Sequence, residues 1–151
     1  MTRPHLFLDS SALFAGVVSA DGASRALLLL AEGNRITITI SEQVVAETER
    51  ALARKLPGAL VYYRQALRGT GLRILPDPAP DQVRAWRDII SHQADVPILV
   101  AAMGAGVDYL VTLNRRHFVD DPSVAARSGL RIGTPGGALA WVREHLARKK
   151  P

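Results

Sequence analysis

The chain has 151 residues, the usual size of one domain, and its hydrophobic fraction of 48% argues against a disordered protein. It contains no cysteine, which excludes disulfide bonds and thiolate zinc sites and fits a reducing compartment. The formal net charge of +5 favours a polyanionic partner such as nucleic acid, although an arginine-rich surface gives the same balance without one.

The N-terminal apolar run covers only residues 6–8 and ends at Asp9, which is too short for a signal peptide. No segment reaches the roughly 18 apolar residues of a membrane span. We therefore expect a cytoplasmic protein without membrane association. One domain is expected over residues 1–151, with a basic tail at about residues 146–151.

Strand-like and helix-like segments alternate along the chain. An apolar strand opens it, and Asp9 then offers an N-cap to a short helix that runs towards Gly16. The β-branched alternation of residues 35–40 predicts a second strand, and Ser41 can cap the helix after it. The expected strands cover residues 5–8, 35–40, 72–75, 107–112 and 130–132, and the expected helices cover residues 22–32, 42–55, 59–68, 81–92, 95–105 and 134 onward.

This alternation predicts a parallel sheet covered by helices on both faces. The proline-rich residues 76–80 form a connector rather than a domain boundary, because neither flank is long enough to stand alone. In the helix expected over residues 81–92, the apolar side chains share one face, which we interpret as core, with a partner groove as the alternative. These side chains are Val83, Trp86, Ile89 and Ile90.

Polar side chains follow the expected strands at the place where an open parallel sheet collects ligands. Such ligands bind beyond the carboxyl ends of the strands. Asp9 directly follows the first strand, and Asn114 stands two residues after Thr112, where the fourth strand ends. Asp95 opens the helix that leads into that strand, so we expect its side chain at the same cleft.

Glu47 is singled out by its position on the helix expected over residues 42–55. It lies three residues after Val44 and four before Ala51, so it borders the apolar stripe of that helix. Glu42 and Glu49 fall further from the stripe and are expected to be solvated.

Three carboxylates in one cleft require a counter-charge. Two like charges ~4 Å apart repel by about 4 kcal/mol at an effective dielectric of about 20. A divalent cation offsets this repulsion, and ligands that are all oxygen favour Mg²⁺ or Mn²⁺ over zinc. One or two such ions can activate water and stabilise an in-line displacement at phosphorus.

Each of these residues also has a purely structural interpretation. Asp9 and Asp95 are good N-caps for the helices that they precede. Glu47 can pair in solvent with an arginine of its own helix, and Asn114 is a common turn residue after a strand. These interpretations stay open, and they are compatible with metal binding because a capping aspartate can also be a ligand.

Four segments that carry these residues resemble the motifs of the PIN domain family. Three resemble its acidic motifs and one its fourth segment, in the family's order over most of the chain. They are FLDSSAL (residues 7–13), SEQVVAE (41–47), DVPILVAA (95–102) and VDYLVTLNRRHF (107–118). The resemblance implies a three-layer α/β/α fold with a central, mostly parallel sheet, and metal-dependent cleavage of RNA.

The resemblance also implies roles for single residues. Asp9, Glu47 and Asp95 match the positions of the acidic ligands for Mg²⁺ or Mn²⁺. Asn114 stands where many relatives have Asp, so it is expected to help orient groups without adding charge, which puts a second metal ion in doubt. Thr112 is expected to form hydrogen bonds around the site.

Charged residues that follow Asn114 have possible roles at the same site. Asp120 or Asp121 can supply the charge that Asn114 lacks, although we favour neither. Arg115 and Arg116 can position RNA phosphates, with a solvated pair as the alternative.

The function expected is that of a metal-dependent endoribonuclease. Many small bacterial members of the family are toxins of VapBC-type toxin–antitoxin pairs, so an antitoxin protein and a homodimer are the partners that the resemblance implies. The alternative is an inactive PIN-like module that binds RNA or protein, which the change to Asn114 favours.

The histidines do not indicate a metal site by their spacing in the sequence. No two of His5, His92, His117 and His145 stand at the spacing of metal ligands, so a zinc site built from histidines is not expected. His117 is interpreted as a surface residue, with a phosphate contact as the alternative. An aspartyl phosphatase is disfavoured because Ser11 stands where a second Asp is usual.

Overall fold

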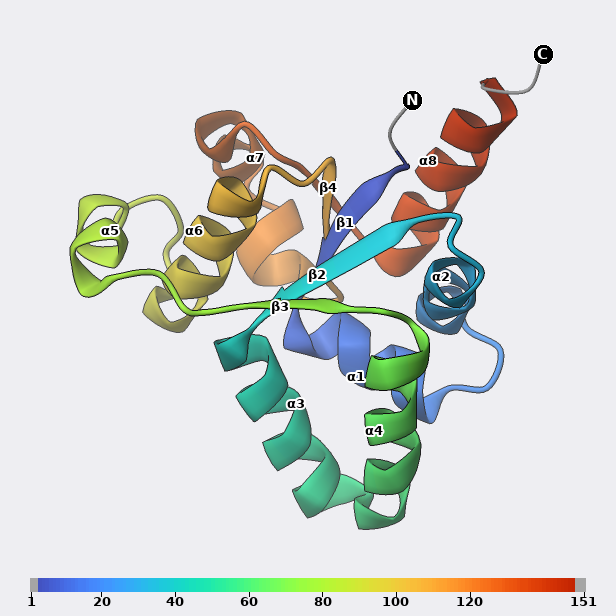
Figure 1. Cartoon of the computed structure of the whole chain (residues 1–151). Helices are drawn as coiled ribbons and strands as arrows, with labels where there is room; N and C mark the ends of the chain where they lie inside the picture. The colour runs from blue at the N-terminus through green and yellow to red at the C-terminus, as the bar shows by residue number, and fades with distance from the viewer. Residues whose placement is uncertain (1–2, 149–151) are drawn as a thin grey trace.

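A five-stranded sheet forms the centre of the computed structural model, which describes residues 3–148 (Figure 1). Its strand order is β3-β2-β1-β4-β5, and all four strand pairs are parallel. This confirms the parallel sheet that the sequence predicts. The strands are β1 (His5–Leu8), β2 (Thr37–Ser41), β3 (Arg73–Leu75), β4 (Tyr109–Val111) and β5 (Arg131–Gly133).

β1 occupies the middle of the sheet, between β2 and β4. Phe7 is in register with Thr39 on one side and Leu110 on the other. Leu6 and Leu8, like Phe7, are fully buried, as expected for a strand covered on both faces. The chain winds from β1 out to β3 and then returns to β4, so the topological switch point lies at the carboxyl end of β1.

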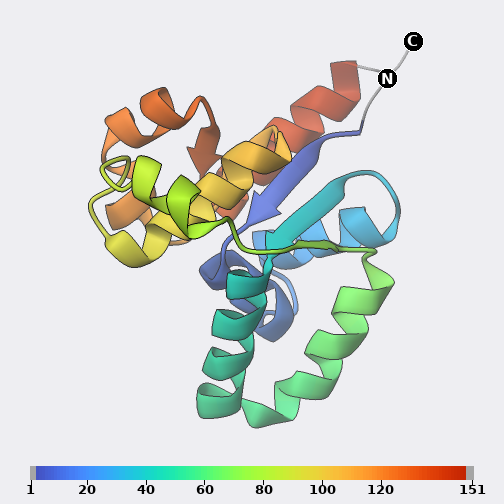
Figure 2. The same cartoon turned by 60° about the vertical axis from the view of Figure 1, so that its left-hand side comes forward.

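Helices cover both faces of this sheet, which confirms the three-layer arrangement. In both views, α1, α2 and α8 lie on one side of the strands, whereas α6 lies on the other side beside α5 (Figures 1 and 2). The α3–α4 hairpin extends beyond the sheet. The helices are α1 (Ser10–Val18), α2 (Ala23–Glu32), α3 (Glu42–Lys55), α4 (Leu60–Gly69), α5 (Pro80–Ala85), α6 (Val96–Ala105), α7 (Pro122–Ser128) and α8 (Pro135–Arg148), with short turns η1 (Pro57–Ala59), η2 (Gln93–Asp95) and η3 (Arg115–Val119).

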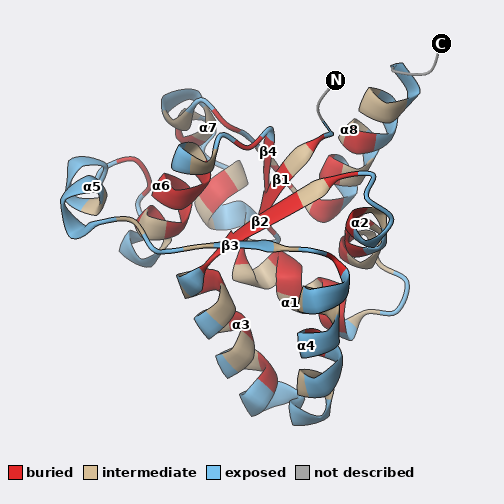
Figure 3. Cartoon of the chain, viewed as in Figure 1, coloured by how far each residue is buried: buried red, intermediate tan, exposed pale blue. Residues whose placement is uncertain are grey.

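The core is concentrated in the central strands β1, β2 and β4 and in α6 (Figure 3). α6 is apolar nearly all round because it is inserted between the sheet and its neighbours. Val96 and Leu99 in this helix are fully buried. Each such aliphatic side chain contributes about 1.5–3 kcal/mol through burial. This packing fixes the start of α6, and therefore Asp95, beside the carboxyl edge of the sheet.

The helix expected over residues 81–92 is much shorter in the structure. α5 ends at Ala85, and Trp86, which was expected in the core, is 41% exposed. No residue of α5 is buried, so no apolar face holds a longer helix in place. The chain turns instead, and this turn brings Ile89 and Ile90 into the core as expected.

The segment after β4 is more regular than the sequence predicted. η3 and α7 occupy residues for which no element was expected. Asn114 and Asp121 provide their N-caps through side-chain oxygens. Of the expected basic tail, Leu146 and Arg148 belong to α8, and residues 149–151 lie outside the described residues.

Within residues 3–148, no single helix is long and apolar enough to cross a membrane. α1 and α2 pass that test only as a pair, by length and composition, and they are bent by 87° at their junction.

Candidate metal centre

Asp9 stands at the carboxyl end of β1 and is almost completely buried. Its backbone N–H donates to Val111 O, which extends the pairing of β1 with β4. Its Oδ1 accepts from Ala12 N at 2.9 Å and caps α1, so the capping interpretation is correct. The carboxylate is only 4% exposed, and burial raises its pKa.

Two hydroxyl groups hold the Asp9 carboxylate in one orientation. Ser11 Oγ donates to Oδ1 at 2.6 Å, and Thr112 Oγ1 donates to Oδ2 at 2.5 Å. Both hydrogen bonds lower the pKa of Asp9 and so oppose the effect of burial, whereas the nearby Asp95 charge raises it further. Thr112 is fully buried, and its Oγ1 also accepts from Asn114 N at 2.9 Å. The expected hydrogen bonding of Thr112 is therefore present.

Glu47 lies on α3 and faces the start of α1. Ser10 Oγ donates to its Oε1 at 3.0 Å, and Gln43 Nε2 donates to its Oε2 at 3.2 Å. The same Gln43 amide donates to Ala94 O at 2.9 Å, which ties α3 to the turn before α6. No arginine forms an ion pair with Glu47 among residues 3–148. Its carboxylate is thus oriented towards the edge of the sheet by neutral donors.

Asp95 precedes α6 but does not cap it with its side chain. Its Oδ2 instead lies 2.9 Å from His117 Nδ1 and 3.2 Å from His92 Nδ1. The side chain is 13% exposed. The carboxylate is therefore directed towards His92, which precedes the same turn, and towards His117 of η3.

Asn114 is joined to Asp95 through His117. Its Oδ1 accepts from His117 N at 3.3 Å and caps η3, and its Nδ2 lies 2.7 Å from His117 Nδ1. The turn interpretation of Asn114 is therefore correct. Because Asn114 N also donates to Thr112 Oγ1, polar contacts run without a break from Asp9 through Thr112, Asn114 and His117 to Asp95.

The carboxylates of Asp9, Glu47 and Asp95 lie around the carboxyl ends of the strands but do not contact one another. Ser10, next to Asp9, contacts Glu47, and the charge of Asp95 acts on Asp9. Among the described residues, however, only His92, Asp95 and His117 bring three ligand atoms within 4.8 Å of one another. A cation held by Asp9, Glu47 and Asp95 together therefore requires side-chain movements.

The other charged residues singled out in the sequence lie around this edge. Arg115 and Arg116 are exposed on η3, and Arg116 lines a depression of about 480 Å³. Asp121 lines the same depression, but its Oδ1 already accepts from Ser123 N and Oγ. Asp120 is exposed at the end of η3. Neither aspartate forms a hydrogen bond with the Asp9 or Asp95 side chain.

Several side chains at the site were missed by inspection of the sequence. The hydroxyls of Ser10 and Ser11 follow Asp9 directly, and a strand that ends in Asp-Ser-Ser before a helix was a readable signal for them. Gln43 lies one helical turn before Glu47, at a spacing that permits its contact. His92 and His117 are 25 residues apart in the chain, and no local pattern indicated that they meet at Asp95.

The structure is that of an α/β protein with acidic side chains at the switch point of a parallel sheet, and comparison with known proteins identifies the family. The sequence model of the PIN domain matches residues 5–116, so the chain belongs to the PIN domain family. The family expected from the four motifs is thereby confirmed. No match is found among curated proteins.

Solved structures share the fold. The VapBC2 complex of Rickettsia felis, bound to a DNA fragment from its promoter, gives a TM-score of 0.64 at 20% identity, covering 86% of this chain and 98% of that chain. PAE2754 of Pyrobaculum aerophilum gives 0.64 at 19% identity, covering 93% and 90%. VapC20 of Mycobacterium tuberculosis, a toxin that cleaves the sarcin–ricin loop, gives 0.53 at 19% identity, covering 70% and 86%. At these identities the likeness concerns the fold alone.

Proposed function

We propose that this chain is a Mg²⁺- or Mn²⁺-dependent endoribonuclease and the toxin of a toxin–antitoxin pair. The observation that carries the proposal is Asp9, a carboxylate buried at the switch point of a PIN domain, whose pKa is raised by burial and by the charge of Asp95. Such a group is typical of functional sites. Membership of the family and the fold of two VapC-type neighbours support the same activity.

The donor set fits a hard divalent cation. Asp9, Glu47 and Asp95 offer carboxylate oxygens, the ligands that Mg²⁺ and Mn²⁺ prefer. The bonds from Ser11 and Ala12 occupy Oδ1 of Asp9, whereas Oδ2 accepts only from Thr112 within residues 3–148 and keeps acceptor capacity for a further partner. A cation at this place offsets the unfavourable burial of Asp9. When bound, it would supply activation of water and neutralisation of charge that develops at phosphorus.

The protein's own side chains perform the positioning. Thr112 and Ser11 restrict the rotation of the Asp9 carboxylate, and Ser10 does the same for Glu47. Glu47 and Ser10 line a groove of about 430 Å³ whose other walls include Phe14 and Leu113. This groove gives an RNA strand access to the carboxyl ends of the strands, where the acidic side chains lie.

Arginines beside this edge favour phosphate binding. Arg115 and Arg116 are exposed on η3, directly after Asn114. Contacts of this kind position a nucleic-acid backbone without reading its sequence. We assign Arg115 and Arg116 to RNA phosphates, and Asn114 to orienting His117 rather than to binding metal directly.

Cleavage of a mixed RNA pool tests the proposal. Wild type, Asp9→Asn and the control Asp21→Asn, which alters an exposed loop carboxylate, are compared in Mg²⁺, in Mn²⁺ and in EDTA. We expect metal-dependent cleavage by wild type and Asp21→Asn, and at least a ~100-fold loss in Asp9→Asn, in line with the loss of a key charge-stabilising group. Equal cleavage by all three proteins would reveal a contaminating nuclease and remove Asp9 from the site.

The competing function is an inactive PIN domain that binds RNA or protein. The engagement of Asn114 with His117, in place of a fourth free carboxylate, favours it. RNA binding without cleavage, equally strong in wild type, in Asp9→Asn and in EDTA, would support the inactive binding domain against the proposed nuclease.

The partners follow from the proposed class. We propose an antitoxin protein that is encoded beside this chain, and a homodimer of the chain itself. Expression of the chain alone should arrest growth, and co-expression with the product of a small adjacent gene should relieve the arrest. Light scattering on the purified chain should give twice the mass of one protomer.

A further inference from the structure

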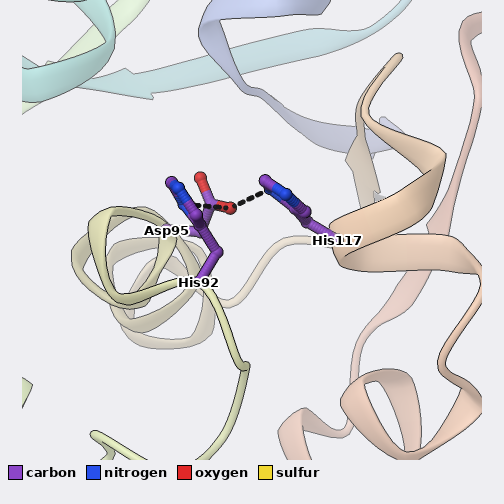
Figure 4. A group of neighbouring side chains, drawn as sticks. All are labelled: His92, Asp95 and His117. Atoms are coloured by element: carbon purple, nitrogen blue, oxygen red, sulfur yellow. Dashed lines mark hydrogen bonds and ion pairs between the residues drawn. The ribbon is translucent and has the colours of Figure 1, made fainter.

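Two histidines from separate segments converge on one carboxylate oxygen of Asp95. His92 precedes the η2 turn and His117 lies on η3, and the Asp95 carboxylate lies beside both rings, with a contact to each (Figure 4). Both Nδ1 atoms approach the same Oδ2, at 3.2 Å for His92 and 2.9 Å for His117. The rings stack with centroids 4.3 Å apart and planes inclined by 18°. The stacking directs both nitrogens to one point.

The hydrogen-bond partners of His117 Nδ1 cannot both be satisfied by this atom. Asp95 Oδ2 can only accept, whereas Asn114 Nδ2 can only donate. When Nδ1 carries a proton, it can donate to Asp95 Oδ2, but it then cannot accept from Asn114 Nδ2. Without that proton, its lone pair satisfies Asn114 but faces the lone pairs of Asp95. A cation bound to the nitrogen and the carboxylate removes the repulsion between them, and the Asn114 amide then has to turn to another acceptor, because Nδ1 has a single lone pair.

The chemistry of these ligands differs from that of the acidic centre. Two imidazole nitrogens and one carboxylate oxygen suit Zn²⁺ and Co²⁺, whereas Mg²⁺ prefers oxygen alone. The three ligand atoms lie within 4.8 Å of one another, so small shifts close them around one ion. His92 and His117 also line the depression of about 480 Å³ on the surface, which gives an ion an entry path.

We propose that His92, Asp95 and His117 form a binding site for a transition-metal ion such as Zn²⁺. Three protein ligands leave a fourth position open towards the depression, where water or a phosphate oxygen can bind. The site does not depend on nuclease activity, but it shares Asp95 with the proposed Mg²⁺ or Mn²⁺ centre. Zn²⁺ bound here therefore withdraws Asp95 from that centre.

Direct metal binding tests the site without measuring activity. Protein freed of any histidine tag is stripped with EDTA and titrated with Co²⁺, which absorbs visible light strongly when its coordination is tetrahedral. Zn²⁺ is then added to displace the Co²⁺. The variants are His92→Ala, His117→Ala and, as a histidine control on α8, His145→Ala. Asp9→Asn is included because it changes only the acidic centre.

We expect a saturable Co²⁺ spectrum at one ion per chain in wild type, His145→Ala and Asp9→Asn. Removal of either site histidine should weaken binding at least ~10-fold, as loss of even a supporting group does in metal sites. His92 is an exposed residue, so His92→Ala keeps the test valid if His117→Ala unfolds. Wild-type binding unchanged in His92→Ala, or no Co²⁺ binding by wild type, would overturn the proposal. Loss of RNA cleavage in Asp9→Asn with Co²⁺ binding retained would separate the two centres.

Discussion

Replacing Thr112 with valine tests whether its hydroxyl holds the acidic centre together. Thr112 is fully buried at the end of β4. Its Oγ1 donates to Asp9 Oδ2 and accepts from Asn114 N. Valine has nearly the same shape, so Thr112→Val removes both hydrogen bonds without opening a cavity. It leaves one carboxylate oxygen and one backbone N–H without these partners.

The cost follows from the type of each hydrogen bond. A bond to a charged group contributes about 1.5–3 kcal/mol, and an ordinary bond about 0.5–1.5 kcal/mol. Together they predict a loss of about 2–4.5 kcal/mol in the free energy of unfolding. In a chain of this size each kcal/mol lowers the melting temperature by about 2–4 °C, so the variant should melt about 4–18 °C below wild type.

Urea unfolding and thermal melting, both in EDTA at neutral pH, measure this loss. Thr112→Ser is the matched control, because it keeps the hydroxyl and loses one methyl group, at about 1 kcal/mol. The valine variant should be less stable than the serine variant by at least about 1 kcal/mol. Equal stability of the two variants, or a valine variant as stable as wild type, would refute the structural role of the hydroxyl.

Two further variants test the metal-free protein and the sheet. Burial raises the pKa of Asp9 above its unfolded value, so its favourable contribution exists at acid pH and is lost as pH rises through the folded pKa. Asp9→Asn should therefore melt above wild type in EDTA at neutral pH, with an advantage that shrinks towards about pH 4; a constant difference would contradict this. In Gly133→Ala, the new Cβ would collide with the Tyr109 hydroxyl, and overpacking costs about 1–3 kcal/mol in urea unfolding. The added change Tyr109→Phe should recover part of that loss, and a stable Gly133→Ala protein would show that Tyr109 can move aside.

Elements with strong local signals were predictable from the sequence. The helix expected over residues 42–55 is α3 with the same ends, because Ser41 caps it through Val44 N and Pro57 lies just beyond its end. The strand expected over residues 5–8 is β1. Its uninterrupted apolar run is typical of a parallel strand buried on both faces. From these elements, the sequence placed Asp9 at the edge of the sheet correctly.

Features that depend on distant packing were not predictable in the same way. Residues 81–92 have helical periodicity, but Trp86 stays 41% exposed instead of entering the core, and α5 ends before it. The hydrogen bond between Thr112 and Asp9 joins residues 103 positions apart. His92 and His117 meet only because η2 and η3 are brought to the same place, which no spacing within either segment encodes.

Asp95 separates a structural role from a functional one more clearly than Asp9 does. Asp9 caps α1, so a helix terminus alone accounts for an aspartate at its position. Asp95 forms no side-chain cap on α6, and its carboxylate turns towards two imidazoles while adding repulsion to buried Asp9. An aspartate that neither caps its helix nor eases its neighbour's burial stabilises the fold only through its contacts with the two histidines. Both metal proposals give Asp95 a further role. A cation binds between Asp95 and Asp9 in the first proposal, and between Asp95 and the two imidazoles in the second.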